Sequence, residues 1–312
     1  MPYSFFVLSG EHEELARDEV VAISKSYDPR ATLNSESRLV IARSVIPWNK
    51  IFRRATFVRI SGNIAGTFSK PSEIYLPITK PVSFACRTIN LSSKKVDSSS
   101  LERQVGTILN QKWNSKVSLS SPHLTVYLII TNTKQYLGYS ETQMPPKRPK
   151  KVIKRPHELD WKLSRCMVNL SRLKEGKMLC DPFCGTGTIL LEAESMGIHS
   201  IGIDFDGKMC DITKRNLAEY GYKSKVINST YQHIQKIKDK IDGIVTDLPY
   251  GTASRSSTSP KKLVKDFLSI VPKKKKLVIM YKKGLDDIED LSKAKKYEIF
   301  RHKSLTRVIA VS

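Results

Sequence analysis

The sequence predicts an α/β protein in which an N-terminal α+β region precedes a doubly wound, mostly parallel α/β domain. Strand-length apolar stretches alternate with amphipathic helical stretches along the chain. The later strands end in polar residues, as they do where a parallel sheet binds a ligand. A basic, proline-rich stretch interrupts the alternation. We therefore divide the 312 residues into an N-terminal unit (1–65), a second small unit (66–143), a linker (144–157) and the α/β domain (158–312).

Composition limits the class of protein. The net charge of +23 favours a polyanionic partner, because lysine and arginine neutralise phosphates and release counterions. A merely lysine-rich surface is the alternative. Apolar runs reach only about five residues, far fewer than a membrane span needs, and we see no signal peptide. We therefore expect nucleic acid as partner and no membrane association.

Cysteine usage points to a reducing compartment. The five cysteines are odd in number and irregularly spaced, which argues against a disulfide framework. Cys180 and Cys184 are four residues apart, but no second pair accompanies them, so we expect no metal site. A cytoplasmic protein is the expectation.

The first 65 residues predict a small α+β unit. Strands are expected at Tyr3–Leu8, Arg38–Arg43 and Phe57–Ser61, with helices at Glu11–Ser24 and Pro47–Ala55 between them. This alternation is typical of a ferredoxin-like unit.

The second unit predicts a strand at Ser83–Asn90, a helix capped by Ser100, and a strand at Thr125–Ile130. Its Phe-Ala-Cys-Arg stretch and its Leu-x-x-Pro-His stretch, which ends at His123, resemble a THUMP domain. That resemblance implies an RNA-binding module of the kind found in tRNA-modifying enzymes.

The linker contains three prolines and six basic residues between Met144 and Arg155, so it is stiff, extended and attractive to phosphate. It is either a solvated spacer or a segment that follows an RNA backbone. A helix over Glu158–Ser171 opens the α/β domain. The strands expected after it are Lys177–Asp181, Ser200–Asp204, Lys225–Asn228, Gly243–Asp247, Lys276–Tyr281, Glu298–Arg301 and Thr306–Val311.

A glycine-rich turn, Asp181 to Thr188, joins the first of these strands to a helix. Gly185 and Gly187 let a ligand approach the backbone N–H groups at the helix N-terminus. The lysine of a phosphate-binding loop is missing, and Leu190 stands where a dinucleotide fingerprint needs glycine. Asp204 suits ribose hydroxyls in both NAD and S-adenosylmethionine sites, so the turn leaves both cofactors open.

A later stretch, Asp247-Leu248-Pro249-Tyr250-Gly251, follows another buried strand. The two stretches together resemble motifs I and IV of the S-adenosylmethionine-dependent amino-methyltransferases. The resemblance implies a Rossmann-fold class I methyltransferase domain with S-adenosyl-L-methionine as cofactor. The residues that it assigns to the cofactor are Asp181, Cys184, Gly185, Thr186, Gly187, Thr188, Asp204 and Asn228; those that it assigns to the base are Asp247, Pro249 and Tyr250. Asp206 is interpreted as a helix N-cap.

The carboxylate of Asp247 favours guanine as the target. Guanine presents two adjacent donors, the ring N1–H and the exocyclic amine, whereas adenine and cytosine present an acceptor beside theirs. Two carboxylate oxygens suit the guanine pattern, while an amide suits the other two bases. The base would be flipped out of its stack and would stack on Tyr250. Positioning and electrostatics would then carry the methyl transfer, without a metal or a covalent intermediate.

The order of these segments, ending in His302-Lys303-Ser304-Leu305-Thr306-Arg307, resembles the archaeal and eukaryal tRNA guanosine N2-methyltransferases that modify position ten. The resemblance implies tRNA as partner and transfer of one or two methyls. The chain is expected to be a monomer, with a small activating subunit left open. Alternatives are modification of position six, methylation of an adenine amine in RNA or DNA, and a non-catalytic tRNA-binding protein. Leu248 departs from the family's Asp-Pro-Pro-Tyr, which leaves the turn less rigid.

Overall fold

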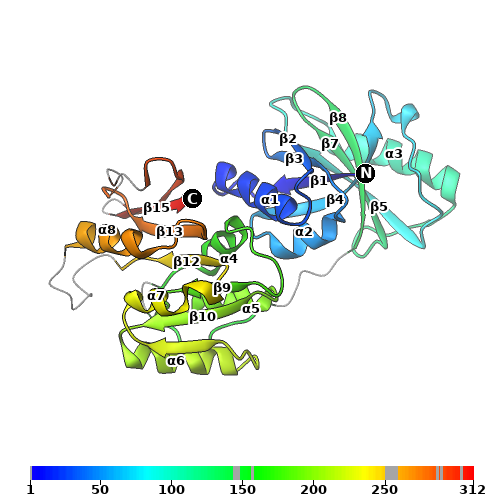
Figure 1. Cartoon of the computed structure of the whole chain (residues 1–312). Helices are drawn as coiled ribbons and strands as arrows, with labels where there is room; N and C mark the ends of the chain where they lie inside the picture. Colours follow the sequence, from blue (N-terminus) through cyan, green and yellow to red (C-terminus); the bar gives the residue numbers. More distant parts are fainter. Residues whose placement is uncertain are drawn as a thin grey trace. The chain divides into compact units, whose positions relative to one another are not determined.

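The computed structural model describes residues 2–142, 148–155, 158–249, 259–285, 288, 291–302 and 305–312. The chain divides into two compact units, one of Met1–Arg53 with Phe57–Pro146 and the other of Arg54–Thr56 with Lys147–Ser312 (Figure 1). Within the described ranges no helix is long and apolar enough to cross a membrane.

The N-terminal unit contains one eight-stranded sheet with the order β2-β3-β1-β4-β8-β7-β5-β6. Its pairs are antiparallel except for β5, which runs parallel to both β6 and β7. One sheet thus includes strands from both segments that the sequence separates near residue 65. The strands are β1 (Tyr3–Leu8), β2 (Thr32–Glu36), β3 (Leu39–Arg43), β4 (Val58–Thr67), β5 (Ser83–Asn90), β6 (Lys116–Val117), β7 (Leu124–Ile130) and β8 (Gln135–Glu141).

Three helices and a 3-10 turn complete this unit: α1 (Glu13–Tyr27), α2 (Trp48–Arg54), η1 (Pro71–Glu73) and α3 (Ser98–Trp113). The predicted cap of α3 was wrong. Asp97, not Ser100, is the N-cap, and its carboxylate accepts the N–H of Ser100. Strand β2 was not predicted because its residues are mostly polar; it lies at the edge of the sheet, where only one side needs a partner.

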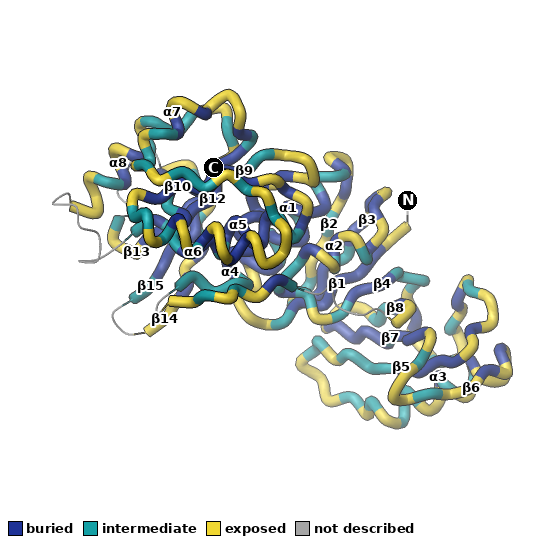
Figure 2. The backbone as a smooth tube through the Cα atoms, turned by 90° about the horizontal axis from the view of Figure 1, so that it is seen from below, coloured by how far each residue is buried: buried dark blue, intermediate teal, exposed yellow. Residues whose placement is uncertain are grey.

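The core of the sheet depends on close packing across strands. Phe5 on β1 is completely buried, and a Cβ on Gly138 of β8 would lie 2.6 Å from its ring. Glycine at that position therefore makes room for the phenyl group. In Figure 2 the tube is dark blue, the colour of buried residues, along most of β1 and β7.

The C-terminal unit contains a seven-stranded sheet with the order β11-β10-β9-β12-β13-β15-β14. Strands β9 to β13 are parallel, whereas β15 is antiparallel to both β13 and β14. The predicted strands of this region are all present with small changes at their ends. They are β9 (Met178–Asp181), β10 (His199–Asp204), β11 (Lys225–Asn228), β12 (Gly243–Asp247), β13 (Lys276–Lys282), β14 (Lys295–His302) and β15 (Leu305–Val311).

Helices cover both faces of this sheet. Ile234 and Ile237 of α7 and Val264 and Phe267 of α8 share a core cluster with strand residues, and no residue of α4, α5 or α6 belongs to that cluster. Because α4 packs on α5 and α5 on α6, these three form the second layer. The helical segments are α4 (Trp161–Leu170), α5 (Thr188–Ser195), α6 (Gly207–Ala218), η2 (Tyr231–His233), α7 (Ile234–Ile237), η3 (Lys238–Lys240) and α8 (Pro260–Ile270).

Candidate active site

The strand order places the two sequence motifs side by side. Strand β9 lies between β10 and β12, and the chain continues from β9 to β10 on one side and reaches β12 on the other. This reversal is the topological switch point, where open parallel sheets bind ligands at the carboxyl ends of their strands. Asp181 ends β9 and Asp247 ends β12 at that edge.

A cavity of about 240 Å³ opens at this edge. Six of the predicted site residues line it: Asp181, Cys184, Gly185, Thr186, Thr188 and Asp247. Gly187, Asp204, Asn228 and Pro249 are not among its walls, and Tyr250 lies outside the described residues. The other lining residues are Arg155, Glu158, Leu159, Phe183, Ile189 and Met209.

Asp181 ties the glycine-rich turn to the neighbouring strand. Its Oδ1 accepts hydrogen bonds from the hydroxyl of Thr246 at 2.6 Å and from the N–H of Phe183 at 3.2 Å. Burial raises the pKa of Asp181 to about 7, and the charges of Asp204 and Asp247 also raise it, although both hydrogen bonds act in the opposite direction. The carboxyl therefore links the start of the glycine-rich turn to β12.

The two glycines of the turn act differently. Gly185 has φ of 51°, and a Cβ there would have no neighbour within 4 Å, so the space beside it is open for a ligand. Gly187, with φ of 82°, is the N-cap of α5, and a Cβ there would lie 2.8 Å from Thr213. Its lack of a side chain therefore serves packing of the loop against α6, rather than ligand approach.

Asp204 holds the same turn from β10. Its Oδ2 accepts the N–H of Gly185 at 2.8 Å and its Oδ1 accepts the N–H of Asp206 at 2.9 Å. Burial raises the pKa of Asp204, against the lowering effect of these hydrogen bonds. Asn228 lies opposite on β11, and its NH₂ group donates to the carbonyls of Asp204 and Phe205 at 3.0 and 2.9 Å. The predicted N-cap role of Asp206 is confirmed, because its side chain accepts the N–H of Lys208.

Asp247 has one engaged and one open oxygen. Its Oδ2 forms an ion pair of 3.2 Å with Nη1 of Arg307, whose side chain is 6% exposed. Its Oδ1 is buried and has no hydrogen-bond partner among the residues that the structure describes. Burial raises the pKa of Asp247 to about 6, while the charges of Arg307 and Arg301 lower it. A buried acceptor without a donor is costly, and a ligand N–H would satisfy it.

The structure gives a reason for Leu248, which stands where the family motif has its first proline. Its N–H donates to the carbonyl of Met280 at 2.9 Å, which extends the β12–β13 ladder by one hydrogen bond. Proline has no N–H and could not form this bond. The leucine side chain is 1% exposed and belongs to the core cluster, and the half-buried Pro249 follows it. Position 248 is thus held by strand pairing and burial, where the family motif has a proline ring.

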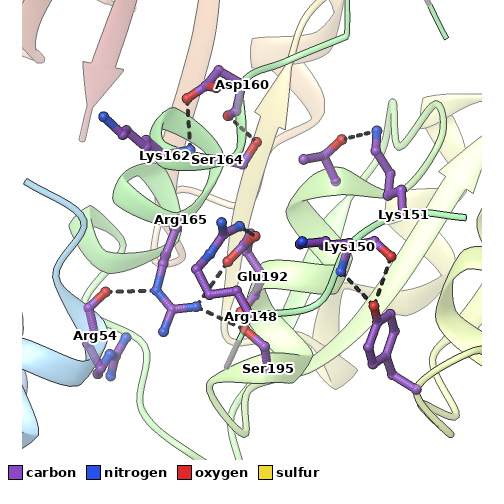
Figure 3. A network of polar contacts seen from close by, with 12 residues as sticks. Arg54, Arg148, Lys150, Lys151, Asp160, Lys162, Ser164, Arg165, Glu192 and Ser195 are labelled. Carbon is purple, nitrogen blue, oxygen red and sulfur yellow. Dashed lines mark hydrogen bonds and ion pairs between the residues drawn. The ribbon is translucent and has the colours of Figure 1, made fainter. Parts of the chain in front are cut away.

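The basic segment 148–155 packs on the C-terminal unit. Nζ of Lys151 contacts Glu158 and donates to the hydroxyls of Thr186 and Thr188 at 2.9 and 2.7 Å. The backbone of Lys150 bonds to Tyr220 (Figure 3). This part of the predicted linker is therefore neither a solvated spacer nor fully available to RNA.

A buried charge network supports the same segment. Glu192 of α5 accepts from Arg148 through one oxygen and from Arg165 of α4 through the other, the latter at 2.9 Å (Figure 3). Arg165 also donates to Ser195 and to the backbone carbonyl of Arg54, each at 2.9 Å. The side chain of Glu192 is 2% exposed, so these two guanidinium groups, and not solvent, balance its charge.

Glu192→Gln is expected to destabilise the chain by about 3–5 kcal/mol, because the buried guanidinium of Arg165 would lose its counter-charge. For a unit of this size the melting temperature should fall by on the order of 10 °C. Calorimetric melting of the full chain measures it. Glu219→Gln, at an exposed position beside α6, is the matched control and should change stability by less than about 0.5 kcal/mol. Equal melting of both variants would contradict the network's role.

Among the described residues the cysteines form no metal-binding group, and the other cavities lie away from the two methyltransferase-like motifs. All five cysteines are free and buried, and the described part of the chain contains no group of three or more His, Cys, Asp or Glu residues suited to a metal. A larger cavity, of about 590 Å³, lies in the N-terminal unit between Trp48, Pro77 and His123. It includes neither sequence motif, so the smaller cavity is the candidate active site.

Sequence reasoning missed four residues that build this site. Thr246 precedes Asp247 on β12. Lys151 and Glu158 lie in the region where only a linker and a helix start were expected. Arg307 was noted within the final motif but not as the partner of Asp247. Sixty residues separate these two, and only the antiparallel pairing of β15 with β13 brings them together.

Comparisons with known proteins relate the chain to methyltransferases. Residues 148–307 match a family model described as an RMKL-like methyltransferase domain, and residues 21–215 match one described as a DNA methylase. A tRNA (guanine(10)-N2)-dimethyltransferase of Methanothermobacter thermautotrophicus is 32% identical, covering 98% of this chain and 97% of the relative. The enzyme of the same name from Methanocaldococcus jannaschii is 28% identical, with 98% of each chain covered.

Solved structures share the fold. The crystal structure of TrmN from Thermus thermophilus aligns with a TM-score of 0.58 at 17% identity, covering 100% of this chain and 99% of that one. A putative methyltransferase, SMU.472, complexed with SAH, aligns with a TM-score of 0.53 at 15% identity, covering 99% and 97%. With a full-length relative above 30% identity and a methyltransferase domain matched over half its length, the chain belongs to the family of tRNA guanosine N2-methyltransferases.

Proposed function

We propose that the chain is an S-adenosylmethionine-dependent enzyme that methylates the exocyclic N2 of a guanosine in tRNA. The observation that carries this proposal is the buried, unpartnered Oδ1 of Asp247 at the rim of the cavity formed by the glycine-rich turn. This oxygen can accept a hydrogen bond from an N–H group of a base that lies beside the glycine-rich turn. Membership of the guanosine N2-methyltransferase family supports the same substrate.

The residues of the turn fit the cofactor. The open space beside Gly185 admits a ligand to the backbone, and the N-terminus of α5 favours its carboxylate. Asp204 would take the ribose hydroxyls, and Oδ1 of Asn228 would accept from the adenine amine, because the NH₂ of Asn228 is already engaged. Asp181, Cys184, Thr186 and Thr188 would form the wall around the amino-acid end, while Gly187 would hold the turn against α6. When bound, S-adenosylmethionine supplies an electrophilic methyl on a sulfonium.

Asp247 would hold the target base. Its Oδ1 would accept from the exocyclic amine and its Oδ2, fixed by Arg307, from the ring N1–H. These hydrogen bonds keep the amine lone pair directed away from the ring and localise it for attack. Pro249 shapes the strand end beside the base. Stacking by Tyr250 stays a prediction from the motif, because that residue lies outside the described part of the chain.

The N-terminal unit would dock the RNA. We assign residues 1–65 to a ferredoxin-like part and 66–143 to a THUMP-like part, which share one sheet. The helices α1 and α2 within the first part, and the order β5-α3-β6-β7-β8 within the second, support these assignments. The net charge of +23 provides the attraction to phosphate. The chain would act as a monomer, with an activating subunit as the alternative.

The relatives' names favour position ten and two methyl transfers, since both nearly full-length relatives are named guanine(10)-N2-dimethyltransferases. A guanine(6)-N2-methyltransferase of Thermus thermophilus is 27% identical but covers only 48% of this chain. Position six is therefore the alternative target.

A second candidate is methylation of an adenine amine, which the match to a DNA methylase family over residues 21–215 favours. That match ends before Asp247, the residue that would contact the base. A carboxylate there counts against adenine, because adenine presents an acceptor beside its amine.

Incubation with labelled S-adenosylmethionine and unmodified tRNA, followed by nucleoside analysis and mapping, tests the proposal. N2-methylguanosine or its dimethyl form at position ten is the expected product. The same nucleoside at position six would keep the chemistry and change the target. Methyladenosine, in tRNA or in a parallel DNA reaction, would favour the second candidate, and the absence of any product would contradict the enzyme proposal.

A further inference from the structure

Strands β14 and β15 lie at one edge of the C-terminal sheet, next to β13. Because β15 runs antiparallel to β13, with Arg307 opposite Lys282, the end of β14 and the start of β15 lie at the carboxyl end of β13. Asp247 ends β12 there too, opposite Met280 of β13. At the usual strand spacing, the end of β14 is three strands, or about 14 Å, from the backbone of Asp247. It therefore belongs to the rim of the candidate active site.

Phe300 is exposed on this rim. It is 68% exposed, the largest value among the ten phenylalanines of the chain. Tyr297 and Ile299 are buried, so the alternation along β14 directs the ring of Phe300 to the opposite, open face, where Glu298 is exposed as well. A single exposed apolar residue is ordinary on a protein surface. The significance of Phe300 therefore depends on the groups around it.

Positive charge lies beside Phe300. Arg301 is exposed and stands just after it, where the pairing of β14 with β15 is irregular. Lys282, at the end of β13, is exposed as well. The exposed carboxylate of Glu298 forms an ion pair of 2.7 Å with Lys283, which neutralises it. The rim beside Phe300 is thus positively charged, as is typical of a surface that binds phosphates.

The charge of Arg301 also acts on the carboxylate that would hold the base. It lowers the pKa of Asp247, as the charge of Arg307 does. Such an effect fades with distance and is screened by solvent and salt, so the guanidinium of Arg301 lies near Asp247. An RNA that places a base at Asp247 would bring its neighbouring phosphates within reach of this arginine.

We propose that Phe300 and Arg301 bind the RNA beside the target guanosine, Phe300 by stacking on an unpaired base and Arg301 by pairing with a phosphate. Extruding the target unstacks its neighbours, and an aromatic ring can replace the lost stacking on one of them. The separation from Asp247 assigns this contact to a flanking nucleotide and not to the target base. The inference rests on the proposed function, because it presumes RNA as the substrate. It adds a contact surface outside both the glycine-rich turn and the Asp247 stretch.

Binding of unmodified tRNA to the full chain, measured by fluorescence anisotropy across a salt series, tests both contacts. Phe300→Leu keeps an apolar side chain but loses the aromatic face, and should weaken binding about 5- to 50-fold, within the cost of losing one stacked base. Phe300→Tyr keeps the aromatic face and should bind as wild type does. Neither variant should change the salt dependence, because stacking releases no counterions.

Arg301→Met should weaken binding too, and should reduce the slope of log affinity against log salt by about one, the effect of one lost phosphate contact. Lys276→Met is the matched control, because it removes a positive charge from the exposed start of β13, at the opposite edge of the sheet. Its affinity and slope should equal those of wild type. At about pH 8, where Asp247 is ionised, kcat of Phe300→Leu and Arg301→Met should stay near wild type while KM for tRNA rises.

The outcomes distinguish this inference from the proposed function. If wild type neither binds nor methylates tRNA, the proposed function fails. If wild type methylates tRNA but Phe300→Leu binds it equally well, the stacking contact is overturned, and an unchanged salt slope in Arg301→Met overturns the phosphate contact. If Phe300→Leu instead changes the association state of the free protein in sedimentation, or lowers its melting temperature, the ring serves a protein interface or the fold, and the inference is overturned as well.

Discussion

Asp247→Asn is expected to reduce methyl transfer to guanosine by on the order of 10²–10³-fold, the usual cost of losing one well-placed electrostatic partner in an active site. The amide keeps the shape of the side chain but replaces one acceptor oxygen by a donor NH₂ group. One of the two guanine N–H groups would then face a donor. Single-turnover methylation of tRNA at saturating S-adenosylmethionine measures the loss.

Asp242→Asn is the matched control for this variant. Asp242 lies just before β12, at the end of the strand opposite Asp247, where its carboxylate contacts Met178 N–H and Lys177. It should keep nearly full activity, and both variants should bind S-adenosylhomocysteine as wild type does. Full activity of Asp247→Asn on guanosine would refute the carboxylate argument, and new activity on adenosine would show that this position selects the base.

Arg307→Met is expected to move the acid limb of the pH–rate profile to higher pH. The base needs the ionised carboxylate, so wild-type activity should rise with pH through about 6, the raised pKa of Asp247. Arg307 lowers that pKa, so its removal must raise it further. At an assay pH below about 6, where the carboxyl of wild type is also mostly protonated, activity should fall about tenfold for each unit of the shift.

The pH profile separates this effect from unfolding. Arg301→Met removes a charge that lowers the same pKa from an exposed position on β14, so its shift should have the same sign and be smaller. Arg307→Lys keeps the charge and should restore part of the profile. If Arg307→Met lost activity equally at every pH, the arginine would only support the fold, and an unchanged profile would contradict its action on Asp247.

The local sequence predicted the elements that form the catalytic edge. Strand β12 begins and ends where expected because Ile244 and Val245 form a short apolar run before the acidic residue. The same reasoning placed Asp181 and Asp204 at strand ends. It mistook the cap of α3, because Asp97 and Ser100 are both good capping residues and only the backbone geometry chooses between them.

By itself the sequence determined the parallel sheet of the C-terminal unit, the glycine-rich turn and the acidic strand end at Asp247, which we propose receives a base. These follow from short-range patterns of apolar, glycine and acidic residues. Only the tertiary structure decided which charges meet there. Arg307 reaches Asp247 through strand pairing across 60 residues, and Lys151 reaches Thr188 across 37 because α6 binds the basic segment. Such pairs depend on burial and on distance in space, and no local periodicity in the chain encodes either.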